Sequence, residues 1–177
     1  MASGAAGPGS PASPDDDRPA TADDVHELCL ALPHVTYGTS WGDMPTYLVS
    51  DPATKARPRG FCIRRRPDPT AVDPATGTPY EDLLVLWAAD QGAKAALVEA
   101  DGPFFTVPHL DGHDSLLVQE SRLGEITRGE LREVLTESWL RLAPAKLARA
   151  FTAAVGSDEP VGLDRLDRLD RTGAPRG

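Results

Sequence analysis

Two capping boxes, one near each end of the chain, limit the folds open to this sequence. Thr21 and Asp24 have the spacing of a helix N-cap and its third residue, and Thr127 and Glu130 repeat that spacing. Apolar residues follow each box at intervals of three and four residues, as on one face of a helix. The first box therefore predicts a helix that ends before Pro33, and the second predicts a longer helix near the end of the domain.

Strand-like segments lie between these two helices. Met44–Val49, residues 60–65 and residues 82–88 are rich in apolar or β-branched side chains and are bounded by turn residues. Three such segments in succession predict an antiparallel meander. Another short strand is expected at residues 116–119, so the sheet should hold about four or five strands.

Two further helices and one long loop complete the predicted architecture. Asp90 is placed to cap a second helix, and Pro144 is placed to begin a fourth helix whose Leu147 and Phe151 face inward. Residues 66–80 hold four prolines and no apolar periodicity, so we expect a long loop there. Helices at both ends and a meander between them predict an α+β fold with a small antiparallel sheet packed against helices.

Composition divides the chain into one domain and two tails. Residues 1–20 are rich in Ala, Gly, Pro and Ser and include the run Asp15-Asp16-Asp17, so we expect a disordered tail. Residues 156–177 contain a Leu-Asp-Arg repeat, whose three-residue period spreads its leucines around a helix. We expect a mobile charged tail there, with a short docking helix as the alternative, and a single domain at residues 21–155.

The cysteines and the absence of targeting signals indicate the cellular compartment. Cys29 and Cys62 each lie in an apolar pattern, which favours buried, reduced thiols over a disulfide. No segment has the length of a membrane-spanning helix, and the N-terminus lacks the basic start and apolar run of a secretory signal. We therefore expect a cytoplasmic location.

The charge balance restricts the choice of partner. The formal net charge is -9, and the predicted domain holds 13 basic and 19 acidic residues. Nucleic-acid affinity rests largely on the neutralisation of phosphates by cations. Such a domain must therefore gather its basic residues on one face if it is to bind DNA.

An ordered set of short segments runs from about residue 21 to residue 151. The set comprises Ala31-Leu32-Pro33, Gly38-Thr39-Ser40-Trp41-Gly42 followed by Pro45, Gly60-Phe61, Phe104-Phe105-Thr106-Val107-Pro108-His109, Asp111-Gly112-His113, Leu116-Leu117-Val118, and Trp139 with Ala143-Pro144. In this order the segments resemble the actinobacterial branch of the MmcQ/YjbR family. The resemblance implies a frataxin-like sandwich and a role as a DNA-binding protein.

The sequence departs from that family at two places. Arg59-Gly60 stands where family members usually carry a Gly-Lys pair, so a phosphate contact by that lysine is not carried over. The loop at residues 66–80 is also longer than the usual turn of the family.

A cluster of basic residues is the candidate site for nucleic acid. It consists of Lys55, Arg57, Arg59, Arg64, Arg65 and Arg66. Cations along a β-ribbon can contact successive phosphates, and an arginine that reaches a base edge can add specificity. The alternative interpretation is an edge strand that its charges protect against pairing with a neighbouring molecule.

A second candidate site draws on the segments most typical of the family. Its residues are Trp41, Pro45, Phe104, Phe105, His109 and His113. Aromatic and apolar groups with a few polar ones suit a small-molecule pocket, and they suit a packed core equally well. His109 and His113 with Asp111 and Asp114 also offer metal-binding groups, but the neighbouring glycine and proline favour a turn, so no metal site is predicted.

No catalytic motif stands out in the sequence. The serines lack the G-x-S-x-G context of a nucleophile elbow, and there is no glycine-rich nucleotide loop. We therefore predict a non-enzymatic domain without a cofactor, with DNA as the partner. The alternative is a small-molecule-binding or protein-interaction module that does not bind nucleic acid.

Overall fold

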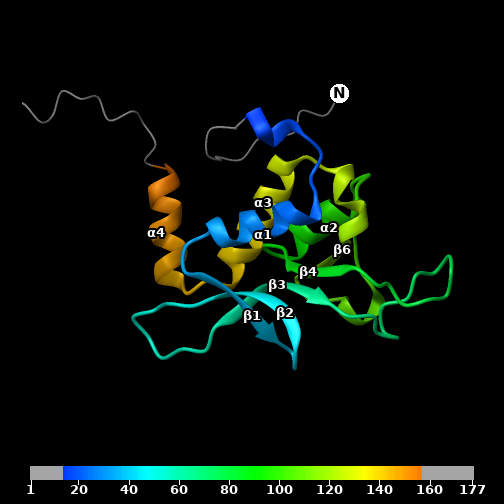
Figure 1. Ribbon diagram of the computed structural model, residues 1–177, viewed down its shortest axis with the longest axis horizontal. Coiled ribbons are helices and arrows are strands. Elements are labelled where there is room, and N and C mark those ends of the chain that lie inside the picture. The colour runs from blue at the N-terminus through cyan, green and yellow to red at the C-terminus, as the bar shows by residue number, and fades with distance from the viewer. Residues whose placement is uncertain (1–13, 157–177) are drawn as a thin grey trace, which may run out of the picture.

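The computed structural model describes residues 14–156 (Figure 1). Its helices are α1 (Ala22–Ala31), α2 (Gln91–Glu99), α3 (Arg128–Leu142) and α4 (Ala145–Gly156), with short 3-10 helices η1 (Pro14–Asp17), η2 (Pro108–Leu110) and η3 (Glu120–Glu125). Its strands are β1 (Val35–Ser40), β2 (Met44–Val49), β3 (Arg59–Arg65), β4 (Leu83–Trp87), β5 (Phe104–Phe105) and β6 (Ser115–Gln119). The predicted α+β class is confirmed.

The strands form one antiparallel sheet in the order β1-β2-β3-β4-β6-β5. Because β2, β3 and β4 are neighbours, the predicted meander is confirmed. The sheet has six strands, and two of them, β1 and β5, lie outside the prediction. β1 has no apolar run, and β5 has only two residues, so neither carries the strong apolar signal of the other strands even though both contain β-favouring residues.

Capping fixes the starts of three helices. The Thr21 side chain accepts a hydrogen bond from the Asp24 amide, and the Asp24 carboxylate accepts one from the Thr21 amide at 2.8 Å. Thr127 and Glu130 make the same reciprocal pair at the start of α3. The Asp90 side chain accepts from an amide in the first turn of α2. The predicted helix starts are therefore confirmed, and each cap supplies partners for amides that have none within the helix.

Helices α1 and α3 cover one face of the sheet (Figure 1) and form the larger core with it. Trp139 lies at its centre, fully buried, and its indole nitrogen donates to the carbonyl of Pro33 at 3.2 Å. The ring of Phe151 packs on Trp139 with centroids 5.0 Å apart, which holds α4 against the core. The predicted inward position of Phe151 is thus confirmed.

A β-bulge in β3 increases the number of side chains that face the helices. Tyr47 pairs with Cys62 and the next residue, Leu48, pairs with Gly60, so Phe61 is the extra residue on β3. A bulge interrupts the alternation of side chains between the two faces of a sheet. Phe61 and Cys62 consequently both lie in the core beneath the helices.

Loops cover the other face of the sheet. Ile63, Val85 and Leu117 form a smaller core there, and Ala71 and Val107 pack against them. Ala71 belongs to the predicted long loop at residues 66–80, which is confirmed as a loop between β3 and β4. That loop therefore contributes to the core and is not merely an insertion at the edge of the sheet.

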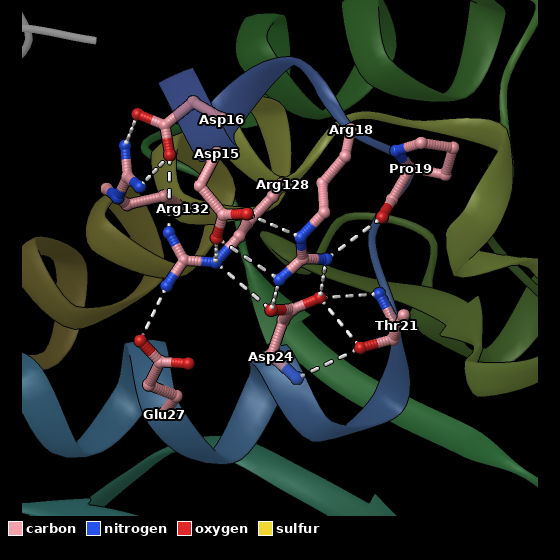
Figure 2. A network of polar contacts seen from close by, with 9 residues as sticks. All are labelled: Asp15, Asp16, Arg18, Pro19, Thr21, Asp24, Glu27, Arg128 and Arg132. Atoms are coloured by element: carbon pink, nitrogen blue, oxygen red, sulfur yellow. Dashed lines mark hydrogen bonds and ion pairs between the residues drawn. The ribbon is translucent and has the colours of Figure 1, made fainter. Parts of the chain in front are cut away.

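Residues 14–20 belong to the folded domain, which corrects the prediction that the tail extends to residue 20. Asp16 lies buried beside α3, where it pairs with Arg128 at 3.2 Å and also with Arg132 (Figure 2). The amide of Ala20 donates to the carbonyl of Ile126 at 2.9 Å. Asp16, from an acidic run that suggests a solvated tail, is here the counter-charge of the buried Arg128 and of Arg132. The remainder of that predicted tail, and all of the predicted C-terminal tail after Gly156, lie outside the described residues.

Both cysteines are free and buried, as predicted. Burial, together with the neighbouring Cys62 thiol, raises the pKa of the Cys29 thiol far above its usual range. A thiol in this state is a poor nucleophile. Among residues 14–156, no helix is long and apolar enough to span a membrane.

Candidate nucleic-acid interface

The loop between β2 and β3 (residues 50–58), called here the β2–β3 loop, carries the exposed part of the basic cluster. Lys55 and Arg57 lie in this loop, and Arg59 begins β3 directly after it. All three side chains are exposed, and none makes an ion pair or hydrogen bond with another residue of the described chain. In Figure 1 the loop projects from the body of the molecule at the lower left.

A buried aspartate organises this loop. Asp51 is its one acidic residue, and the carboxylate accepts a hydrogen bond from the amide of Ala53 at 2.8 Å. The carbonyl of Asp51 also accepts from the amide of Thr54 at 3.1 Å. Because the carboxylate is turned inward, the exposed charges of the loop are all positive.

Arg64 lies on the helix face of β3 and serves the fold. Its guanidinium contacts the carboxylate of Glu120 at 3.2 Å and donates to the carbonyl of Ala22 at 3.4 Å. Burial opposes the charge of Arg64, but Glu120, Tyr47 and Tyr37 together outweigh it, and the pKa of Arg64 is raised. For Glu120 the balance is reversed, because burial raises the pKa of its carboxyl more than Arg64 lowers it.

Arg65 lies on the opposite face of the sheet. Its side chain is only 10% exposed, and it contacts Asp68 at 3.1 Å and the hydroxyl of Thr70 at 2.7 Å. It thereby holds the loop at residues 66–80 against the smaller core. Arg66 is exposed and pairs with Asp43 at 2.8 Å, in the turn between β1 and β2.

The six predicted basic residues therefore do not form one surface. Adjacent residues of a strand point to opposite faces, and this alternation separates Arg64 from Arg65. The three arginines at residues 64–66 each pair with a carboxylate of the domain. Only the group around the β2–β3 loop keeps its cations available to a partner.

The residues of the predicted aromatic pocket are also dispersed. Phe104 faces the helix layer, while Phe105 lies on the other face with its ring 5.0 Å from that of Tyr80. Trp41 is 59% exposed in the β1–β2 turn and meets Trp87 edge-on at 6.3 Å. Of the remaining residues of this predicted pocket, Pro45 is half-buried in β2, and His109 and His113 are exposed in the segment before β6.

The described residues contain no group of three or more His, Cys, Asp or Glu side chains arranged to hold a metal ion. His109 and His113 thus lack a convergent third ligand within residues 14–156.

A cavity that the sequence does not indicate lies between α2 and the segment that follows β5. It has a volume of about 260 Å³, and its lining includes Lys94, Val98, Thr106 and Asp111. Lys94 is only 5% exposed, and its ammonium donates to the carbonyls of Leu110 at 2.7 Å and His113 at 2.8 Å. The Thr106 hydroxyl is buried without a hydrogen-bond partner in the described chain. A lysine on a short amphipathic helix suggests an exposed side chain, so the sequence gives no signal for this site.

Comparison with known proteins yields relatives of no described activity. No family model matches the chain. Uncharacterized proteins of Mycobacterium bovis and of two strains of Mycobacterium tuberculosis are each 42% identical over 79 residues, which cover 44% of this chain and 59% of theirs. The chain thus spans little more than half the length of these relatives. A crystal structure of Deinococcus radiodurans protein DR2400, a DUF419 domain, is 20% identical with a TM-score of 0.48, and the alignment covers 77% of this chain and 88% of that one.

Proposed function

We propose that this chain is a non-catalytic DNA-binding module of the MmcQ/YjbR type, and that the β2–β3 loop contacts the phosphate backbone. The observation that carries the proposal is the set of exposed, unpaired cations at Lys55 and Arg57, on a projecting loop whose one carboxylate is buried, and at Arg59 directly after it. The resemblance of the ordered sequence segments to the MmcQ/YjbR family supports the same partner.

The acidic charge of the whole chain does not prevent this contact. At physiological ionic strength, charges more than about 8 Å apart in solvent are largely screened from each other. A phosphate beside the tip of the loop therefore interacts mainly with the local cations. Three cations are few, so binding is expected to be weak and non-specific, with a Kd of about 10⁻⁴ to 10⁻⁶ M.

A salt series tests the proposal quantitatively. In fluorescence anisotropy with a labelled duplex, three phosphate contacts should give a slope of log K against log salt of about -3, since each contact contributes about -0.9. The double variant Lys55→Ala, Arg57→Ala should reduce the slope by about 2. Absence of binding even at low salt, or a slope that this variant leaves unchanged, would reject the β2–β3 loop as a DNA site.

A matched control separates a local contact from an effect of net charge. Lys146 and Arg149 are exposed residues of α4, and they form the same pair of residue types as Lys55 and Arg57. The double variant Lys146→Ala, Arg149→Ala changes the net charge by the same amount. It should leave the salt dependence close to that of the parent protein.

The burial of both thiols supports a non-catalytic role for the cysteines. Thiols are the most nucleophilic neutral side chains at neutral pH, and both cysteines are buried away from any cavity named above. Free, buried thiols also suit a reducing compartment, which supports a cytoplasmic location.

The cavity beside α2 supports a second candidate function, the binding of a small molecule. Lys94 has one donor left after its two backbone carbonyls, the Thr106 hydroxyl is unpaired, and Glu99 and Asp111 also line the cavity. A small ligand that carries both a carboxylate and an ammonium group is therefore complementary. Saturation-transfer NMR with acetate and glycine as probes tests this candidate. A saturation-transfer signal from the protein to a probe that disappears in Thr106→Val would support binding in this cavity. Absence of the signal for both probes would reject binding of this ligand class.

A further inference from the structure

Strand β1 is an open edge of the sheet. It has six residues, whereas β5, at the opposite edge, has only two. An edge strand presents a row of unpaired N–H and C=O groups to the surroundings. Within the described chain, β1 is therefore the one long stretch of backbone that is ready to pair with a further strand.

The register shows which residues of β1 present these groups. The amide of Ser50 donates to the carbonyl of His34, so positions 34, 36, 38 and 40 turn their backbone groups toward β2. Pro45, which has no amide hydrogen, lies opposite Thr39, as expected at a pair that exchanges no hydrogen bonds. Val35, Tyr37 and Thr39 consequently direct their N–H and C=O groups away from the sheet.

This edge lacks the features that commonly prevent strand pairing. Its sequence, Val-Thr-Tyr-Gly-Thr-Ser, contains no charged residue and no proline, and the bulge of the sheet lies at β3 and not here. Two acidic molecules repel each other over most of their surfaces, and a neutral edge is a place where they can approach.

An exposed aromatic side chain, Tyr37, lies on the edge strand itself. The large hydrophobic residues that are exposed in the described chain are Leu30 (43%), Tyr37 (49%) and Trp41 (59%). Tyr37 lies in β1 and Leu30 lies on α1, which packs against β1, whereas the Trp41 ring turns from the end of β1 toward Trp87 of β4. The ring of Tyr37 is held by His26 and Tyr47, with centroids 5.6 Å and 4.9 Å away, so its exposed side is already ordered.

We propose that a second copy of this chain pairs with β1 in an antiparallel, two-fold arrangement centred on Tyr37. A two-fold axis at this position matches Val35 of each copy with Thr39 of the other and uses all three outward residues. About six main-chain hydrogen bonds join the copies, because each such pair exchanges two. The two sheets become continuous, and the two Tyr37 rings form a cross-strand pair.

The oligomeric state tests this arrangement without DNA. Sedimentation velocity of the full chain at about 100 μM, well above a Kd of about 1 μM, should give twice the chain mass of 18.8 kDa. Thr39→Pro removes an outward amide hydrogen without touching a bond to β2, and it should lower the dimer fraction at least tenfold. Thr39→Val keeps the amide and should remain dimeric.

A charge variant and an exchange measurement complete the test. Tyr37→Lys sets two like charges opposite each other and should give a monomer, whereas Ala53→Lys, with the same charge in the β2–β3 loop, should not. In the parent protein, hydrogen exchange at the amides of Val35, Tyr37 and Thr39 should slow as the protein concentration rises.

Several outcomes would overturn the proposal. These are a monomer at every concentration, a dimer that resists both Thr39→Pro and Tyr37→Lys, and exchange at these amides that does not depend on concentration. Failure of the dimer is distinguishable from failure of DNA binding, because the variant Lys55→Ala, Arg57→Ala should keep the mass of the dimer.

Discussion

At the scale of single residues, Ser138 joins a helix to two strands through one hydroxyl. The hydroxyl, fully buried on α3, donates to the carbonyl of Phe61 and accepts from the amide of Trp87 at 2.9 Å. Ser138→Ala leaves both backbone groups unpaired, and each unpaired buried group costs about 1–3 kcal/mol. We expect the free energy of unfolding in urea to fall by about 2–4 kcal/mol.

A second hydroxyl on the same helix provides the control. Thr136 is half-buried on α3, and its side chain makes no hydrogen bond within the described residues. Thr136→Ala should change the unfolding free energy by less than about 1 kcal/mol, in the range of substitutions away from such networks. An equal effect of the two substitutions would show that the Ser138 hydroxyl has no special role.

The residue scale also marks a limit of prediction from sequence. The run Arg64-Arg65-Arg66 suggests one cationic patch, but its members pair with Glu120, Asp68 and Asp43 in three different parts of the molecule. Strand alternation predicts that neighbours separate, whereas the identity of each partner depends on tertiary contacts. The exposure of Lys55 and Arg57 fits their place in a polar loop, and the buried Asp51 beside them gives no sign in the sequence.

At the scale of elements, the start of α1 makes stability depend on pH through Asp24. Hydrogen bonds from Arg18 hold the pKa of the Asp24 carboxyl well below its usual range, although burial opposes this shift. A group whose pKa is depressed on folding stabilises the protein above its unfolded pKa of about 3.9, and this stabilisation is lost as pH falls toward the folded value.

Asp24→Asn should therefore destabilise the protein at neutral pH and matter less in acid. At pH 7 we expect a loss of about 3–5 kcal/mol, the usual cost of removing one partner of a buried ion pair. Urea unfolding at pH 7 and pH 3 measures the difference between parent and variant, which should shrink at pH 3. A difference that stays constant with pH would mean that the charge of Asp24 is not responsible.

Elements with strong local signals are those that the sequence predicts well. α1 and α3 begin at capping boxes, and β2 and β4 follow from their apolar runs. β1 differs because it has no apolar run and no buried residue, although its Val, Thr and Tyr residues favour strands. Its conformation depends on the register with β2, which is a contact between segments and not a property of either one.

At the scale of the whole molecule, residues 14–20 link α1 to α3 through ion pairs and hydrogen bonds. Asp16 pairs with Arg128 and Arg132 (Figure 2). The carbonyl of Arg18 also accepts a hydrogen bond from the amide of Arg128 at 2.9 Å. Removal of residues 1–20 should lower the melting temperature by several degrees relative to removal of residues 1–13. Thermal unfolding followed by circular dichroism compares the two deletions, and equal melting temperatures would contradict this role.

The position of the domain boundary could not be predicted because its determinants are far apart in the sequence. An Asp run after a segment rich in Gly and Pro has the composition of a solvated tail. Its partner Arg128 is buried at the first position of α3, where a cation is unfavourable unless carboxylates surround it. The acidic run and Arg128 are both visible in the sequence, but only the fold shows that their side chains are in contact.

The contacts of residues 14–20 with α3 also impose an order on events during protein synthesis. Asp16 and Arg128 are separated by 112 positions, and ribosomes add about 5–20 residues per second, so Asp16 is made roughly 6 to 22 s before Arg128. The capping box of α1 can close in that interval because both of its residues are already present. The ion pairs at Asp16 must wait until α3 has left the exit tunnel, so the first described residues of the chain are among the last to reach their native contacts.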